Sequence, residues 1–172
     1  MSSISSVHNR KTALVIHGGA GVMSRSSMSA ETESAYLDSL NEALDAGNAV
    51  LQQGGSARQA VIASILVLED CPLFNAGKGS VYNAEGGHEL DASIMEGHTS
   101  KAGAVAGVRT IRNPILLAEA VMEHSPHVML AIDGRLVESP ADVVGAAHAA
   151  GADAPLTYTL LRLGSREIVP VR

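Results

Sequence analysis

The sequence has few aromatic residues, a single cysteine and no long apolar run. Trp is absent and aromatic residues make up 2% of the 172 positions, although hydrophobic residues reach 46%. This composition predicts one domain-sized chain whose core is built from Ala, Val, Leu and Ile in closely packed layers. Because Cys71 stands alone, an internal disulfide framework and a cysteine-based zinc cluster are excluded, and we expect a reduced, cytoplasmic setting.

Positive charge is also scarce. The chain has 12 Lys and Arg against 18 Asp and Glu, a net charge of −6, and no basic run. This balance argues against nucleic acid or an anionic membrane as the partner. The first apolar run, Ala13 to Ile16, is too short for an export signal, and Val61 to Leu68 is too short to span a bilayer. The sequence therefore predicts a soluble protein.

Hydrophobic periodicity predicts a strand followed by two helices in the first half of the chain. Thr12–Ile16 has the character of a short buried strand, and the spacing of Leu residues in Glu31–Gln53 is helical. Ser56 and Gln59 form a capping box before a second helix, Ala57 to about Leu68, which is apolar nearly all round.

The second half is predicted to add two strands and a helix. Glu89–Met95 alternates between apolar and polar residues, Ala102–Val108 has the small apolar character of a central strand, and a helix runs from Asn113-Pro114 to Pro126. A fourth helix from Ser139-Pro140 to Gly151 and a strand at Leu156–Leu161 are expected in the tail. The fold class is α/β (α+β), with a mixed sheet packed between helices.

Residues 17–21, His-Gly-Gly-Ala-Gly, follow the first predicted strand. A similar loop supplies oxyanion-binding amides in lipase-like esterases, but those enzymes also need G-x-S-x-G, which this sequence lacks. The spacing does not match the G-x-G-x-x-G of dinucleotide sites either. On the residues alone, a strand-exit turn that allows close backbone approach is favoured over an esterase-like serine hydrolase.

Residues 71–80, Cys-Pro-Leu-Phe-Asn-Ala-Gly-Lys-Gly-Ser, pose a similar choice. They lack the first glycine and the Ser or Thr after the lysine that a phosphate loop requires. A loop rich in Gly can instead turn several carbonyl oxygens toward a hard cation. The alternative, favoured by spacing alone, is a helix-to-strand connection in which Phe74 fills the core.

The run His88-Glu89-Leu90-Asp91 places its two carboxylates on one strand face and its histidine on the other. Such a pair can be catalytic, but a hydrogen-bonded strand edge is the commoner case. His17, His124 and His127 fit no metal-ligand spacing, so we interpret them as structural.

Taken together, four stretches resemble the α-subunit half of the plant-type L-asparaginase / isoaspartyl peptidase family. They are ALVIHGGAGVMSR, LEDCPLFNAGKGSVYNAEGGHELDASIMEG, KAGAVAGV and RNPILLAEAVMEHSPHVM, which together run from about Ala13 to Leu130. The prediction divides the chain into a disordered stretch at 1–10, a family-like region at 11–130 and a divergent tail at 131–172.

The resemblance implies half of an αββα sandwich, the N-terminal-nucleophile hydrolase fold. It also implies self-cleavage that frees an N-terminal Thr on a β-subunit, and hydrolysis of isoaspartyl dipeptides and L-asparagine. The partners it implies are that β-subunit, in a dimer of αβ pairs, and a small amino-acid or dipeptide substrate, without nucleic acid or membrane.

The resemblance further assigns roles in the two loops. It implies no organic cofactor and one sodium ion, held by main-chain carbonyls. Gly18 and Gly19 would line the cavity, and Asn75 would support the nucleophile region or self-cleavage. The carbonyls would be those of Leu68, Glu69, Cys71, Phe74, Ala76 and Lys78.

The G-T-[VI]-G stretch that opens the family's β-subunit is missing, and the late threonines, Thr157 and Thr159, lie in a different context. Two explanations stay open. The chain is either a separate α-subunit whose β partner is another polypeptide, or a truncated and inactive remnant.

Overall fold

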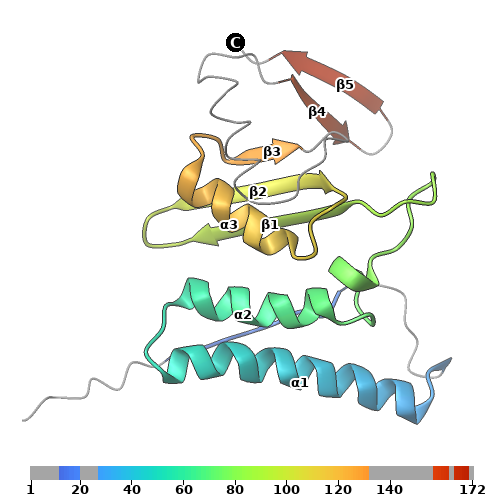
Figure 1. The fold of residues 1–172 in the computed structure, drawn as a ribbon, viewed down its shortest axis with the longest axis vertical. Helices are drawn as coiled ribbons and strands as arrows, with labels where there is room; N and C mark the ends of the chain where they lie inside the picture. Colours follow the sequence, from blue (N-terminus) through green and yellow to red (C-terminus); the bar gives the residue numbers. More distant parts are fainter. Residues whose placement is uncertain (1–11, 20–26, 132–156, 163–164, 171–172) are drawn as a thin grey trace, which may run out of the picture.

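The computed structural model describes residues 12–19, 27–131, 157–162 and 165–170. In these ranges it has three α-helices and a three-stranded mixed sheet (Figure 1). The α+β class is therefore confirmed. The helices are α1 (Ala30–Gln52), α2 (Ala57–Asp70) and α3 (Pro114–His124), and the strands are β1 (Leu90–Glu96), β2 (Lys101–Val108) and β3 (Met129–Ala131).

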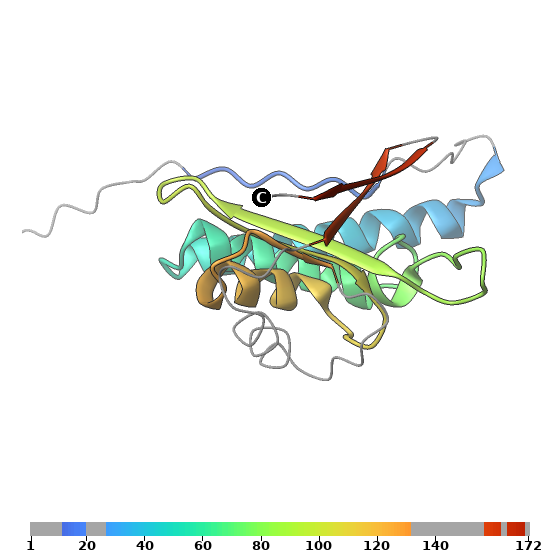
Figure 2. The same ribbon diagram turned by 90° about the horizontal axis from the view of Figure 1, so that it is seen from above.

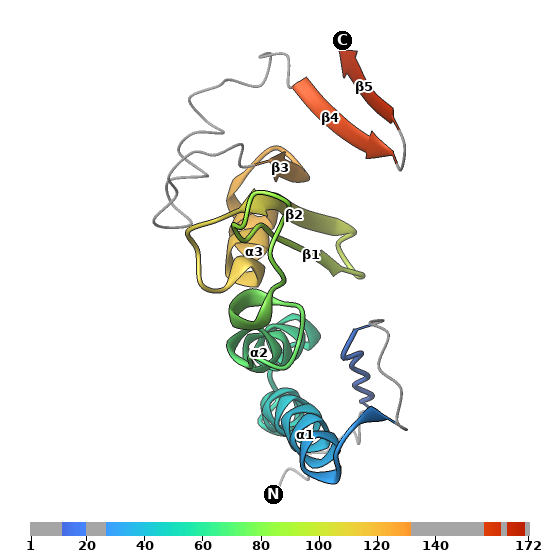
Figure 3. The ribbon, with the colours of Figure 1, turned by 90° about the vertical axis from the view of Figure 1, so that its right-hand side faces the viewer.

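β2 is the central strand of this sheet, as its small apolar sequence predicted. It pairs antiparallel with β1 and parallel with β3, in the order β1-β2-β3. Figures 2 and 3 show the three helices on one side of the sheet. The predicted packing of a mixed sheet against helices is therefore confirmed, although the described residues place no helices on the other face. The reason lies in the alternation of β1, where Leu90, Ala92 and Ile94 are sheltered while Asp91 and Ser93 are exposed.

The two long helices begin with the caps that the sequence encodes. The Ser29 side chain accepts a hydrogen bond from the Thr32 N–H at the start of α1. The predicted capping box is confirmed at α2, where the Ser56 hydroxyl accepts from the Gln59 N–H and the Gln59 side chain accepts from the Ser56 N–H.

α1 and α2 pack closely along a seam of small residues. The Ser64 hydroxyl of α2 donates to the Ala43 carbonyl of α1 over 2.7 Å. A Cβ at Gly47 would lie 2.9 Å from the Ala60 carbonyl oxygen, so no side chain fits at position 47. The predicted packing of small residues is confirmed here.

α2 and α3 run antiparallel and are joined at both ends. At one end, Arg58 of α2 forms ion pairs with Glu119, at 3.4 Å, and with Glu123 of α3. At the other end, the Glu69 carboxylate accepts from the Ile115 N–H of α3. α3 then packs on the sheet around a buried cluster of mostly aliphatic side chains, namely Ile62, Ile94, Val105, Val108, Ile115, Leu117, Ala118, Val121 and Met122.

The expected strand at Thr12–Ile16 is wrong. The segment at 12–19 is extended and its exposure alternates, but it belongs to no strand ladder among the described residues. Its Leu14 side chain lies near Gly47 of α1, whereas Val15 is 88% exposed on the opposite side. The segment thus has the backbone course of a strand but lacks the hydrogen-bonded neighbour that defines one.

In the tail, the strand predicted at Leu156–Leu161 is confirmed as β4 (Thr157–Arg162). It pairs antiparallel with β5 (Ser165–Pro170), which the sequence analysis did not predict. The expected helix from Ser139 to Gly151 and the expected disorder at 1–10 lie outside the described residues. None of the helices in the described part has both the length and the apolar character that crossing a bilayer requires.

Candidate functional site

The candidate site is centred on the loop at 71–80, which leaves the C-terminal end of α2 and contains the short 3-10 turn η2 (Gly77–Gly79). The loop folds back tightly on the helix end. A Cβ at Gly77 would lie 2.3 Å from the Glu69 carbonyl oxygen, and one at Gly79 would lie 2.2 Å from the Phe74 carbonyl oxygen. Gly77 also has φ +48°, a left-handed conformation that favours glycine. These two positions therefore require glycine.

Internal hydrogen bonds hold the loop in this curled shape. The Ala76 N–H donates to the Phe74 carbonyl over 2.8 Å, and the Gly79 N–H donates to the Ala76 carbonyl over 3.0 Å. The exposed Asn75 side chain closes the loop, because its Oδ1 accepts from the Val81 N–H over 2.9 Å. Of the six carbonyls assigned by resemblance, those of Phe74 and Ala76 thus already accept one hydrogen bond each, which leaves a second lone pair on each oxygen.

Phe74 connects the loop to the segment at 12–19. Its ring is 5% exposed and packs edge-on against Tyr36 of α1, with ring centroids 5.6 Å apart. A Cβ at Gly18 would lie 3.1 Å from both the Phe74 ring and the Leu40 side chain. The structure therefore brings Gly18 against the loop, and the core-filling role considered for Phe74 is confirmed.

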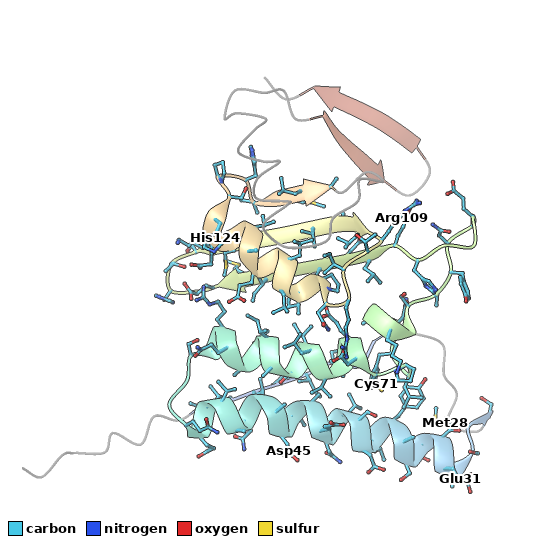
Figure 4. All side chains as sticks on the ribbon, viewed as in Figure 1. Met28, Glu31, Asp45, Cys71, Arg109 and His124 are labelled. Carbon is cyan, nitrogen blue, oxygen red and sulfur yellow. The ribbon has the colours of Figure 1, made fainter. Side chains whose placement is uncertain are left out.

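Gly19 and Cys71 lie at the edges of this arrangement. Gly19 has φ +111°, and its N–H donates to Nδ1 of His17 over 3.1 Å. Figure 4 shows Cys71 at the C-terminal end of α2 beside α1, where its thiol contacts the Ser39 hydroxyl at 3.5 Å. Cys71 is a free cysteine, and the residue is half-buried.

The carboxylate of Glu69 is a functional group that the sequence analysis missed, because only its main-chain carbonyl had been considered. The residue is 3% exposed, and its Oε1 accepts from the Ile115 N–H over 3.1 Å. Its neighbour Asp70 accepts from Arg112 at 2.8 Å and from Asn113 at 3.3 Å. These hydrogen bonds hold the start of α3 against the C-terminal end of α2, where the loop begins. The sequence signal for this role was the position of Glu69 near the C-terminal end of a helix that is otherwise mostly apolar.

Burial raises the pKa of Glu69 to about 7, although its hydrogen bonds with Asn113 and Ile115 act in the opposite direction. The raised pKa fits the geometry, since Oε2 is buried and has no hydrogen-bond partner. The protonated form of this side chain is therefore favoured in the folded state below neutral pH.

This raised pKa predicts a pH-dependent loss of stability. Folded Glu69 retains its proton between the unfolded value of 4.5 and about pH 7, so its contribution to stability is full below pH 4.5 and is lost as the pH rises to 7. In the Glu69→Gln variant, the side chain at position 69 is uncharged at every pH. The free energy of unfolding of Glu69→Gln minus that of the wild type should rise by roughly 3 kcal/mol from pH 4.5 to pH 8.

Urea unfolding at several pH values measures this difference. Glu85→Gln is the matched control, because the Glu85 side chain is 80% exposed. The control should show no comparable trend. A difference between Glu69→Gln and the wild type that stays constant with pH would contradict the prediction.

The run His88–Asp91 has a structural role, as its commoner interpretation predicted. His88 Nδ1 lies 3.0 Å from the Ser80 hydroxyl, and Glu89 pairs with Arg109. Asp91 Oδ1 accepts from the Gly107 N–H over 2.9 Å, beside the irregularity in the pairing of β1 with β2. The part of the chain that the structure describes contains no group of three or more His, Cys, Asp or Glu side chains placed to hold a metal ion.

Comparison with known proteins identifies the family. The sequence model of a family described as asparaginase matches residues 10–137. The chain is 50% identical to the isoaspartyl peptidase of Salmonella typhimurium over 124 residues, 49% identical to that of Escherichia coli over 124 residues, and 46% identical to the plant-type L-asparaginase of Pyrococcus abyssi over 122 residues. This protein belongs to the asparaginase family that includes the isoaspartyl peptidases.

These matches cover 72%, 72% and 71% of this chain but only 40%, 39% and 38% of the three relatives. The chain therefore spans less than half the length of the curated relatives it matches. The candidate loop and the segment at 12–19 both lie within the residues that the family model covers.

Proposed function

We propose that this chain is the α-subunit-like part of an amidohydrolase that cleaves isoaspartyl dipeptides and L-asparagine. The observation that carries the proposal is the family match over residues 10–137, in which the chain covers about 40% of relatives named isoaspartyl peptidases. The reactive hydroxyl would belong to an N-terminal Thr carried by a β-subunit that lies outside this chain.

Such a Thr suits amide hydrolysis for a chemical reason. Its own α-amino group, with a pKa near neutrality, can accept the hydroxyl proton as the oxygen attacks the carbonyl carbon. The leaving amine or ammonia takes a proton, and water then releases the product from the ester intermediate. In this scheme Gly18 and Gly19 line the cavity, and Asn75 holds the loop beside the nucleophile by its bond to Val81.

We also propose that the loop holds a sodium ion and that no organic cofactor is needed. Two close approaches between backbone segments support this proposal. A Cβ at Gly77 would collide with the carbonyl oxygen of Glu69, and a Cβ at Gly79 would collide with that of Phe74. Carbonyl oxygens without side-chain charge suit a hard monovalent cation. The ligands would be the main-chain oxygens of Leu68, Glu69, Cys71, Phe74, Ala76 and Lys78.

Gly79→Ala tests the cation site. The new Cβ would lie 2.2 Å from the Phe74 carbonyl oxygen and 2.7 Å from the Pro72 carbonyl oxygen. The backbone must therefore shift, and the proposed carbonyl ligands of the cation would move apart. A cation present at about 100 times its Kd stabilises a protein by roughly 2.7 kcal/mol. We therefore expect the wild type to melt several degrees higher in sodium chloride than in choline chloride of equal ionic strength, and the variant to lose this difference.

Gly87→Ala is the control for the sodium test. Its nearest neighbour would be the Asn83 side chain at 3.7 Å, which is an ordinary contact distance. This variant should keep the full difference between the two salts. Equal melting temperatures of the wild type in the two salts would contradict the sodium proposal.

The proposed assembly is a dimer of αβ pairs that works in the cytoplasm on small amino-acid or dipeptide substrates. The half-buried, unpaired thiol of Cys71 is compatible with a reducing compartment.

The decisive experiment is a hydrolysis assay of the purified full chain with β-aspartyl dipeptides and L-asparagine. We expect no turnover by the chain alone. Co-expression with the part of the Salmonella isoaspartyl peptidase outside the 124 matched residues should give turnover. Turnover by the chain alone would contradict the proposal that the nucleophile lies on the β-subunit. A stable complex without turnover would favour the alternative that the chain is an inactive remnant.

A further inference from the structure

The segment that connects η2 to β1 has an aromatic side chain at its surface. Tyr82 is 72% exposed, and its neighbour Val81 is 64% exposed. The Tyr82 ring packs against the His88 imidazole, with ring centroids 4.4 Å apart and planes inclined at 36°. Aromatic residues are scarce in this sequence, with one Phe and three Tyr, and the Phe74 ring is by contrast buried. Tyr82 therefore contacts a second ring while most of its own surface remains exposed to a ligand.

Hydrogen bonds within the segment hold this pair of rings in place. His88 Nδ1 lies 3.0 Å from the Ser80 hydroxyl. Between the two rings the chain turns back on itself, because the Asn83 N–H donates to the Gly87 carbonyl over 2.8 Å. Asn83 Oδ1 also accepts from the N–H groups of Glu85, over 3.0 Å, and of Gly87, over 2.9 Å. The turn thus fixes Tyr82 beside His88 before any ligand arrives, which lowers the entropic cost of binding.

The same segment is joined to the candidate site. Asn75 Oδ1 accepts from the Val81 N–H over 2.9 Å, and Val81 directly precedes Tyr82. Standard backbone dimensions then place the Tyr82 Cα within about 8 Å of Asn75 Oδ1. Figure 1 shows the segment at the same end of the molecule as η2. An extended dipeptide has a similar length, roughly 7 Å.

These distances place the Tyr82 ring within reach of the second residue of an isoaspartyl dipeptide. In the proposed function Asn75 lies beside the nucleophile, so the scissile amide of the substrate would lie near Asn75. The residue that leaves would extend about one residue length, roughly 3.5 Å, beyond that amide. L-Asparagine has the same side-chain amide but releases only ammonia, so it has no group that could reach Tyr82.

We propose that Tyr82, supported by His88, contacts the leaving residue of isoaspartyl dipeptides and favours dipeptides in which that residue is aromatic or apolar. This inference rests on the proposed function and names a substrate preference within it. The exposed face of the Tyr82 ring packs on the side chain of the leaving residue, in the offset or edge-on arrangement that aromatic groups prefer. His88 is a positioning residue, because it contacts the Tyr82 ring and not the substrate.

Two substitutions at position 82 test the contact. Tyr82→Ala removes the ring, whereas Tyr82→Phe retains it. Leu37→Ala is the matched control, because Leu37 is also an exposed apolar side chain, at 52%, and belongs to α1. Each variant of the full chain is co-expressed with the part of the Salmonella relative outside the 124 matched residues, and this added polypeptide supplies the nucleophile in the proposed scheme. kcat and KM are then measured with β-aspartyl-phenylalanine, β-aspartyl-glycine and L-asparagine.

We expect Tyr82→Ala to lower kcat/KM for β-aspartyl-phenylalanine about tenfold, mainly by raising KM, because the contact is made equally in the bound substrate and in the transition state. The values for β-aspartyl-glycine and L-asparagine should change by less than about twofold. Tyr82→Phe and Leu37→Ala should resemble the wild type with all three substrates. An equal loss for all three substrates, or no loss for β-aspartyl-phenylalanine, overturns the inference and leaves the proposed function standing.

A second measurement does not depend on turnover. A β-aspartyl-phenylalanine analogue, in which a CH2–NH group replaces the scissile amide, is added to the wild-type complex, and the Tyr82 ring signals are followed by NMR after assignment with Tyr82→Phe. We expect these signals to shift with this analogue and to stay unchanged with its glycine counterpart.

The outcomes separate this inference from the proposed function. Absence of hydrolysis with every substrate contradicts the proposed function, and the ring signals then decide the inference, which shifted Tyr82 signals support and unshifted signals overturn. If Tyr82→Ala instead changes the size of the assembly, measured by light scattering, the ring contacts another chain and the inference is overturned.

Discussion

Gly103→Val is expected to lower the free energy of unfolding by about 3 kcal/mol, one of the two largest effects predicted for a single substitution in this chain. A Cβ at this position of β2 would lie 2.2 Å from the Ala118 carbonyl oxygen and 2.5 Å from the Met122 backbone nitrogen. Both are backbone atoms of α3, so the helix itself must move away from the sheet.

The consequence extends beyond one contact because α3 is central to the core. Leu117, Ala118 and Val121 have no exposed surface, and displacement of the helix would loosen all three. Interiors are packed at the density of organic crystals, so such a shift cannot be absorbed locally. Urea unfolding followed by circular dichroism measures the loss.

Gly97→Ala is the control for this prediction. Gly97 lies between β1 and β2, and a Cβ there would have no neighbour within 4 Å. Its effect should stay within about 0.5 kcal/mol. Equal stability of Gly103→Val and the wild type would mean that β2 and α3 do not approach as closely as described.

Phe74→Ala is expected to lower the free energy of unfolding by about 3 to 5 kcal/mol, the usual range for a buried phenylalanine. Phe74 is 5% exposed and lies edge-on to Tyr36, and a Cβ at Gly18 would lie 3.1 Å from its ring. Removing the ring therefore disconnects three parts of the chain, namely the loop, α1 and the segment at 12–19. The change should also raise hydrogen exchange in the loop at 71–80.

Tyr82→Ala is the matched control, because Tyr82 is an aromatic residue shortly after the loop with 72% exposure. Its ring contacts only His88 among the described aromatic contacts, with centroids 4.4 Å apart, so the loss should stay below about 1 kcal/mol. If Phe74→Ala were no more destabilising than Tyr82→Ala, Phe74 would not anchor the candidate site.

Local signals explain why much of the fold could be predicted. The Ser56–Gln59 capping box needs only four consecutive residues, and it forms as expected. The alternation along β1 likewise identified its sheltered and exposed faces correctly, because side-chain direction in a strand follows from sequence position alone. The central position of β2 followed from its small apolar residues.

Features that depend on distant residues could not be predicted. The segment at 12–19 has a strand-like sequence, but whether it becomes a strand depends on a neighbour that the described residues do not provide. The roles of the Glu69 carboxylate and of Gly103 depend on the start and the middle of α3, which are 46 and 15 residues away in the sequence. Of the candidate site, sequence identified the two glycine-rich loops, and only the structure brought Gly18 against Phe74.

Our central proposal is that this chain supplies part of the scaffold of an amidohydrolase whose nucleophile lies on a β-subunit outside this chain. The most direct measurement is covalent labelling of the co-expressed complex with a diazoketone analogue of asparagine, followed by mass spectrometry of the separated chains. We predict that the adduct is found on the N-terminal Thr of the added polypeptide and that the mass of this chain is unchanged. An adduct on a residue of this chain would contradict the claim.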